Sequence, residues 1–215
     1  MQDGTKIPAV ARRRGRPRRV EPAQALDRAL EAFWTHGYAG TSLDALSSAT
    51  GMNRPSLYAT FGDKQQLYLR TLDRFGERME AAAVAAMADA ATLREALAGF
   101  YRGALSVYLG DARDDGPLAR GCHVICTAAA EAPEEPAIRA ALQAVLALID
   151  RRLAERFAAA VAAGELPADS DVEALGLLAG ATLHSLAIRA RAGTPRPTLE
   201  RLVEAAVARL CGPAG

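Results

Sequence analysis

The 215 residues are 50% hydrophobic and 24% charged, a composition typical of soluble globular proteins. Alanine is abundant and aromatic residues are few, which favours helices over strands. The longest uncharged apolar stretch, residues 174–188, has 15 residues, whereas a bilayer span needs about 20, so we expect no membrane span. Three cysteines, an odd number, do not indicate a disulfide framework, and we expect a cytoplasmic protein with reduced thiols.

Positive charge is concentrated at the N-terminal end. Residues 1–70 contain 11 Lys and Arg against 6 Asp and Glu, a net charge of +5, whereas residues 71–215 contain 15 against 19, a net charge of −4. A basic end on an otherwise acidic chain indicates a polyanionic partner, and phosphate contacts there would weaken as the salt concentration rises. A solvated basic tail is the alternative explanation.

Glycine, proline and capping residues divide the chain into about nine expected helices and no strand. Residues 1–20, with two prolines and six arginines, are expected to be a disordered basic arm. Gly51 is expected to turn the chain between the second and third helices, and Asn53 to cap the third. Thr41, three residues before Asp44, is expected to cap the second. The expected helices begin near residues 21, 42, 54, 63, 92, 118, 136, 170 and 197.

The second and third expected helices have the size and spacing of a helix-turn-helix. Around them, residues 33–38 (FWTHGY), 41–43 (TSL) and 51–64 (GMNRPSLYATFGDK) resemble the DNA-binding domain of the TetR family. The likeness covers about residues 20–70, a third of the chain. It implies an all-α fold, with a three-helix, homeodomain-like DNA-binding domain over residues 21–68 and a helical effector-binding and dimerisation domain over residues 69–215.

The same resemblance implies a function and a set of DNA contacts. The function is that of a homodimeric transcriptional regulator, a repressor that leaves a palindromic operator when a small-molecule effector binds or a thiol is modified. Arginine at the start of a recognition helix suits guanine, because its planar fork meets O6 and N7 together. Packing and capping are the alternative roles for Tyr58 and Thr41. The predicted contacts in this domain are Thr41, Ser42, Asn53, Arg54, Pro55, Ser56, Tyr58 and Lys64.

The basic arm carries a second DNA-binding pattern. Residues 14–19 (RGRPRR) look like an AT-hook, in which proline favours an extended backbone and arginines enter a narrow minor groove. Arg16 and Arg18 are therefore predicted contacts. Non-specific attraction to phosphates is the alternative.

The last two expected helices are predicted to form the dimer interface that the resemblance implies. Glycines spaced four residues apart permit a close helix approach, and the final helix carries its own apolar stripe. Burial within one chain would give the same pattern. The predicted interface residues are Gly176, Gly180, Leu183, Leu199, Leu202, Val203, Ala206 and Leu210.

A sensing site is expected among the helices that cover residues 92–192. Cys122 lies near an expected helix start beside His123, where a helix dipole and an imidazolium would favour the thiolate. A buried apolar thiol is the alternative. The candidate effector or redox residues are Phe100, Tyr101, Tyr108, Cys122, His123 and His184.

Two other function classes remain open from the sequence. A small enzyme could use Cys122 as the nucleophile with His123 or His184 as the base. However, the sequence shows no third residue at a spacing typical of a group that orients such a base. A non-specific, nucleoid-type DNA binder would keep the basic arm without needing a recognition helix. No metal-ligand cluster or phosphate-binding glycine loop is found, so we expect no metal, cofactor or catalytic activity.

Overall fold

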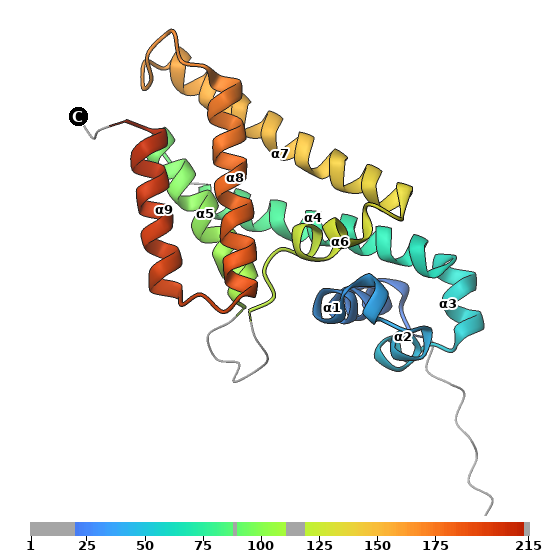
Figure 1. The fold of residues 1–215 in the computed structure, drawn as a ribbon. Coiled ribbons are helices and arrows are strands. Elements are labelled where there is room, and N and C mark those ends of the chain that lie inside the picture. The colour runs from blue at the N-terminus through green and yellow to red at the C-terminus, as the bar shows by residue number, and fades with distance from the viewer. Residues whose placement is uncertain (1–19, 88–89, 111–118, 213–215) are drawn as a thin grey trace, which may run out of the picture.

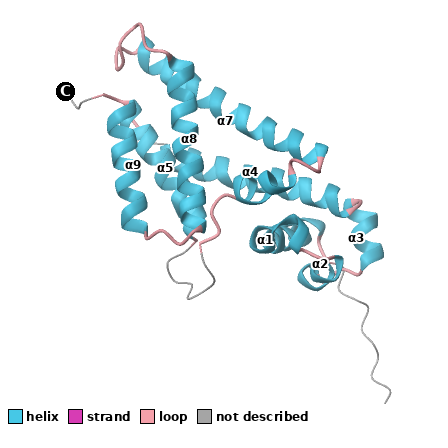
Figure 2. Cartoon of the chain, viewed as in Figure 1, coloured by secondary structure: helices cyan, strands magenta, loops and turns pink. Residues whose placement is uncertain are grey.

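The computed structural model describes residues 20–87, 90–110 and 119–212, which form nine α-helices and a short π-helical segment without any strand (Figure 2). The predicted all-α fold is confirmed. Arg16 and Arg18 lie outside the described residues. The elements are α1 (Pro22–Gly40), α2 (Leu43–Thr50), α3 (Arg54–Phe61), α4 (Lys64–Met87), α5 (Leu93–Leu109), η1 (Val124–Ala128), α6 (Ala129–Glu131), α7 (Pro136–Ala162), α8 (Val172–Arg191) and α9 (Arg196–Leu210).

The first three helices gather at one end of the molecule, and α5, α8 and α9 lie together at the other (Figure 1). Helix α4 connects the two ends. Its first half packs against α1, where Tyr68 meets Phe33 and Phe75 meets Trp34 edge to face. Its last turns lie against α5 at Gly103, where an added Cβ would come within 3.0 Å of Ala82 O. Because α4 is one continuous helix, the predicted domain boundary at residues 68–69 falls inside it.

The segment before η1 differs from its prediction. A helix was expected from about residue 118, but residues 119–122 are not helical and the π-helix begins at Val124. Gly121 has a φ of +66° and lies against α8, where an added Cβ would collide with Ala187 O. Tertiary contact with α8 therefore delays the helix start. No described helix is long and apolar enough to cross a membrane.

Candidate nucleic-acid interface and sensing site

Local capping builds the turn between α2 and α3. Ser42, not Thr41, is the N-cap of α2, and its hydroxyl accepts from Ala45 N at 3.1 Å, so Asp44 does not complete a capping box. Gly51 takes a φ of +72°, which glycine adopts without a steric penalty. Asn53 then caps α3, because its side-chain oxygen accepts from Ser56 N at 2.9 Å. The predicted turn and the Asn53 cap are confirmed.

Helix α3 has one buried face and one exposed face. Leu57 and Phe61 are each 3% exposed and anchor the helix on the core. Arg54, Pro55 and Tyr58 are exposed, and Tyr58 keeps 47% of its surface accessible. A large aromatic ring left in solvent next to an arginine is suited to contact a partner.

Arg54 is held by a carboxylate from the preceding helix. Its Nη2 and Nε donate to Asp44 Oδ1 at 2.7 and 3.1 Å. Both side chains are more than half exposed, so the ion pair contributes at most about 1 kcal/mol to stability. The pair orients the guanidinium at the start of α3. Asp44 is a residue that the sequence reasoning did not assign to this surface.

Two predicted phosphate contacts are engaged within the protein. Thr41 is fully buried, and its hydroxyl donates to Gly37 O at 2.6 Å, where Gly37 (φ +75°) interrupts α1. The predicted donation from this hydroxyl to a phosphate is therefore wrong. The Lys64 ammonium lies 4.4 Å from the centre of the Tyr38 ring, and partial burial lowers its pKa.

His123 is the centre of a buried polar network. Its Nε2 lies 3.1 Å from Thr71 Oγ1 and its Nδ1 lies 3.3 Å from Thr127 Oγ1, which is 2.6 Å from Tyr68 OH. Burial, together with the charges of Arg191, Arg120 and Arg78, lowers the pKa of His123 to about 3. The ring is neutral at physiological pH, so it supplies no imidazolium.

The thiol next to it is not activated as the sequence suggested. Cys122 is 7% exposed, and burial raises the pKa of its thiol to about 12. Of the two interpretations that the sequence left open, the buried apolar thiol fits this environment, because the helix starts later than expected and the imidazole stays neutral. Cys122 behaves as a small buried side chain.

The other predicted effector residues mostly fill the core. Tyr101 is fully buried and its hydroxyl donates to Ala179 O at 3.0 Å. Tyr108 is 1% exposed, and Phe100 is partly buried in contact with Tyr101. His184 is half-buried, and its Nε2 has no hydrogen-bond partner among the described residues. These side chains do not line the groove found in this half of the chain, which is formed by η1, α6 and the end of α8.

Comparison with known proteins identifies the family to which the chain belongs. Residues 25–71 match the model of the bacterial regulatory proteins of the tetR family, and residues 102–206 match that of the tetracyclin repressor-like C-terminal domain. The chain is 32% identical over 198 residues to the HTH-type transcriptional repressor ComR of Escherichia coli, covering 92% of this chain and 90% of ComR. The chain belongs to the TetR family.

A solved structure of a relative supports the same family assignment. It is a cysteine mutant of the TetR family transcriptional regulator CifR complexed with 26-bp double-strand operator DNA. The TM-score is 0.80 at 34% sequence identity, over 89% of this chain and 98% of that one. This TetR-family chain is a DNA-binding transcriptional regulator.

In this TetR-family chain, most of the predicted dimer-interface residues pack within the chain. An added Cβ on Gly176 would come within 2.9 Å of the α7 backbone, and one on Gly180 within 2.6 Å of Asp150 Oδ1. The two glycines thus let α8 approach α7 of the same chain. The remaining predicted residues are buried (Leu183, Leu199, Val203 and Leu210) or half-buried (Leu202 and Ala206). Packing within one chain, the alternative that the sequence left open, therefore explains Gly176, Gly180 and the four buried residues, and their part in a dimer interface stays a prediction.

The junction between α1 and α8 was not found from the sequence. Arg191 Nη1 donates to Trp34 O and to Arg120 O, each at 3.1 Å. Trp34 Nε1 donates to Gly121 O at 3.0 Å. A basic residue in the last turn of a helix is too common a signal to reveal such a link.

Proposed function

We propose that the chain is a homodimeric repressor, which binds a palindromic operator through α3 of each subunit and leaves it when an effector binds to residues 69–215. The observation that carries the proposal is the exposed face of α3, where Arg54, Pro55 and Tyr58 project beside a turn built by Gly51 and Asn53. In the sequence, the helix-turn-helix follows the basic residues 1–19, which contain seven Lys and Arg against one Asp, a net charge of +6.

The relatives support both the sign of regulation and the partner. ComR is described as a repressor, and CifR is described in complex with operator DNA. Arg54 is the base-reading residue in our proposal, with Ser42, Asn53, Pro55, Ser56, Tyr58 and Lys64 around it. We also propose a cytoplasmic location, where a chromosomal operator is accessible.

Exposed leucines support a homodimer. Leu177 and Leu178 on α8 are each 58% exposed, although leucine is usually among the most buried residues. They lie on the face of α8 opposite Leu183, which packs inward. A second copy that covers this face would pair two α3 helices for the two halves of a palindrome.

A fluorescence anisotropy titration tests the proposal. The probe is DNA that flanks the protein's own gene, compared with the same sequence with one half of its palindrome scrambled. We expect saturable binding of the intact palindrome by a dimer, and Arg54→Ala is expected to weaken it by about 1–3 kcal/mol. Arg209→Ala, which removes an exposed charge from α9, is the matched control and should bind as the unmodified protein does.

Equal affinity for intact and scrambled DNA would contradict the proposal and favour a non-specific, nucleoid-type binder. A stable monomer on the intact palindrome would contradict the dimer.

A further inference from the structure

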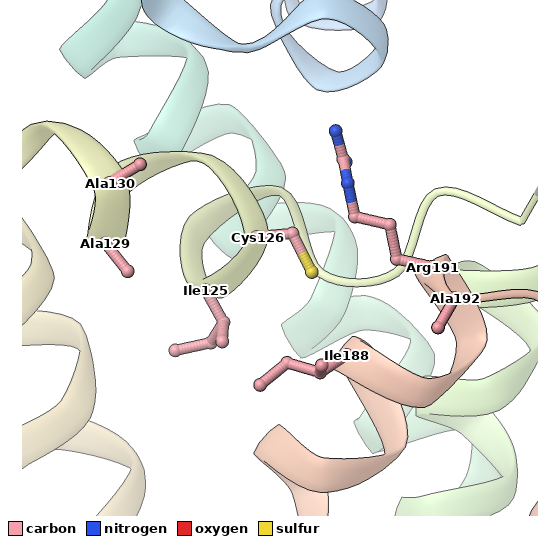
Figure 3. A pocket seen from close by; sticks show the side chains of 7 residues that line it. All are labelled: Ile125, Cys126, Ala129, Ala130, Ile188, Arg191 and Ala192. Carbon is pink, nitrogen blue, oxygen red and sulfur yellow. The ribbon is translucent and has the colours of Figure 1, made fainter.

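A groove of about 440 Å³ lies between the π-helical region and the end of α8 (Figure 3). The groove is shallow and open to solvent along most of its length. In Figure 3, Ile125 and Ile188 face each other across it, and the Cys126 sulfur points toward the base of Arg191. It is lined by Ile125, Cys126, Ala129 and Ala130 from η1 and α6, and by Ile188, Arg191 and Ala192.

The groove has an apolar body and a cationic end. Ile188 is 56% exposed, which leaves apolar surface available to a ligand. Burial raises the pKa of Cys126, so its thiol is neutral and adds no negative charge. Arg191 is the charged residue of the lining.

The surroundings of Arg191 are electropositive. The charges of Arg191, Arg120 and Arg78 all act on His123 and lower its pKa. Among the described residues, Glu31 is the carboxylate that pairs with Arg78 and Arg120. The guanidinium groups of Arg78 and Arg120 lie over the ring of Trp34, whose backbone carbonyl binds Arg191. Arg191 therefore belongs to a cluster of three guanidinium groups that share one carboxylate, and this excess of positive charge suits an anion.

Arg191 also connects the groove to the helix that carries the DNA-binding end. Gly37 interrupts α1, and such an interruption leaves carbonyls of the preceding turn without helical partners. Trp34 O lies in this turn and accepts from Arg191 Nη1, a cation placed where a helix end is negative. In Figure 3 the Arg191 guanidinium points from the groove rim toward the neighbouring blue helix, α1.

We propose that this groove binds a small organic monocarboxylate, with its alkyl chain between Ile125 and Ile188 and its carboxylate on Arg191, and that binding loosens the Arg191 cap on α1. A carboxylate is a stronger acceptor for a guanidinium than a neutral carbonyl, so it competes with Trp34 O and Arg120 O. The proposal names the effector class and its site, and it rests on the proposed function as a repressor.

The first test is a titration of the full-length protein with butyrate, hexanoate and octanoate. Trp34 is the only tryptophan of the chain, so its fluorescence reports directly on the α1 junction. We expect a saturable change, with an affinity that rises by up to about fourfold per added methylene until the groove is filled. Octylamine and octanol, which match octanoate in chain length, should bind at least tenfold more weakly.

Three variants assign the response to the groove. Arg191→Gln removes the cation, and Ala129→Phe fills the groove while leaving the Arg191 cap in place. Both should weaken octanoate binding at least tenfold, and Ala129→Phe should still bind operator. Arg189→Gln is the matched control, because Arg189 is exposed in the same turn and bonds to Ser185 instead. It should respond as the unmodified protein does.

Operator binding separates this proposal from the one on which it rests. Saturating octanoate should lower operator affinity at least tenfold in the unmodified protein and in Arg189→Gln. If the operator is bound but none of the three acids changes Trp34 fluorescence, or octylamine acts equally well, or Ala129→Phe still responds, the groove proposal is overturned and the repressor stands. If no palindromic DNA is bound at all, the proposed function itself fails.

Discussion

The polar side chains around α3 are held by near neighbours in the sequence, whereas the network around His123 also joins residues more than fifty positions apart. Asn53 bonds three residues ahead and Arg54 bonds ten residues back. His123 instead reaches Thr71, 52 positions away. A recognition surface made of local contacts can change its side chains without unfolding the protein, whereas the His123 network cannot change without loss of stability.

The largest expected effect is on stability, from a substitution at Gly121 in the junction between α1 and α8. Gly121→Ala is expected to lower the free energy of unfolding by about 3 kcal/mol or more, because the new Cβ adds a positive-φ penalty to a collision with Ala187 O. Gly164→Ala is the matched control: Gly164 has a φ of +75° but nothing within 4 Å, so only about 1–2 kcal/mol should be lost. Urea denaturation measures both. Equal losses would show that Gly121 is not held by α8.

A smaller effect is expected from the protonation of His123. Its pKa is about 3 in the folded chain and near 6.5 when unfolded, so the unfolded state takes up the proton first. The stability that the neutral ring contributes is present above about pH 6.5 and is lost as the pH falls, by about 1.4 kcal/mol per pH unit, or about 2 kcal/mol at pH 5.

Urea denaturation at pH 7.5 and pH 5 of the unmodified protein and of His123→Asn measures this contribution. The variant should lose about 2 kcal/mol less between the two pH values than the unmodified protein does. His36→Asn, on the exposed surface of α1, should follow the unmodified protein. The same pH dependence in His123→Asn would assign the titration to another group.

The smallest expected effect is on DNA affinity, from a substitution at Asp44 beside α3. Asp44→Asn removes a negative charge next to Arg54 and frees its guanidinium, so binding to random DNA should tighten by about threefold to tenfold, the equivalent of about 1 kcal/mol. The free energy of unfolding should change by less than about 1 kcal/mol, because both partners are exposed. Anisotropy titrations and urea denaturation give the two numbers.

Glu173→Gln removes an exposed carboxylate from the first turn of α8, at the other end of the molecule, and is the control for charge alone. If it tightens DNA binding as much as Asp44→Asn does, the effect comes from net charge and not from the Asp44–Arg54 pair.

The sequence by itself determined the elements at the DNA-binding end. Residues 54–61 form the predicted third helix, with Gly51 in the turn and Asn53 as the cap. The all-α class and the starts of the long helices near residues 136 and 170 were also predicted. These features depend on φ preferences, capping hydrogen bonds and apolar spacing, which act over a few residues and are therefore visible in a short window of sequence.

Tertiary structure alone decided which apolar face of α8 turns inward, where the helix before α6 begins, and what His123, Cys122 and Arg191 contact. Gly176 and Gly180 gave the same pattern for packing on α7 and for packing on a second subunit, because a close helix approach needs small residues in either case. Cys122 and His123 are adjacent in the sequence, but the pKa of each depends mainly on burial, and that of His123 also on the charges of Arg191, Arg120 and Arg78. Burial and distant charges are properties of the folded chain, so no local pattern contains them.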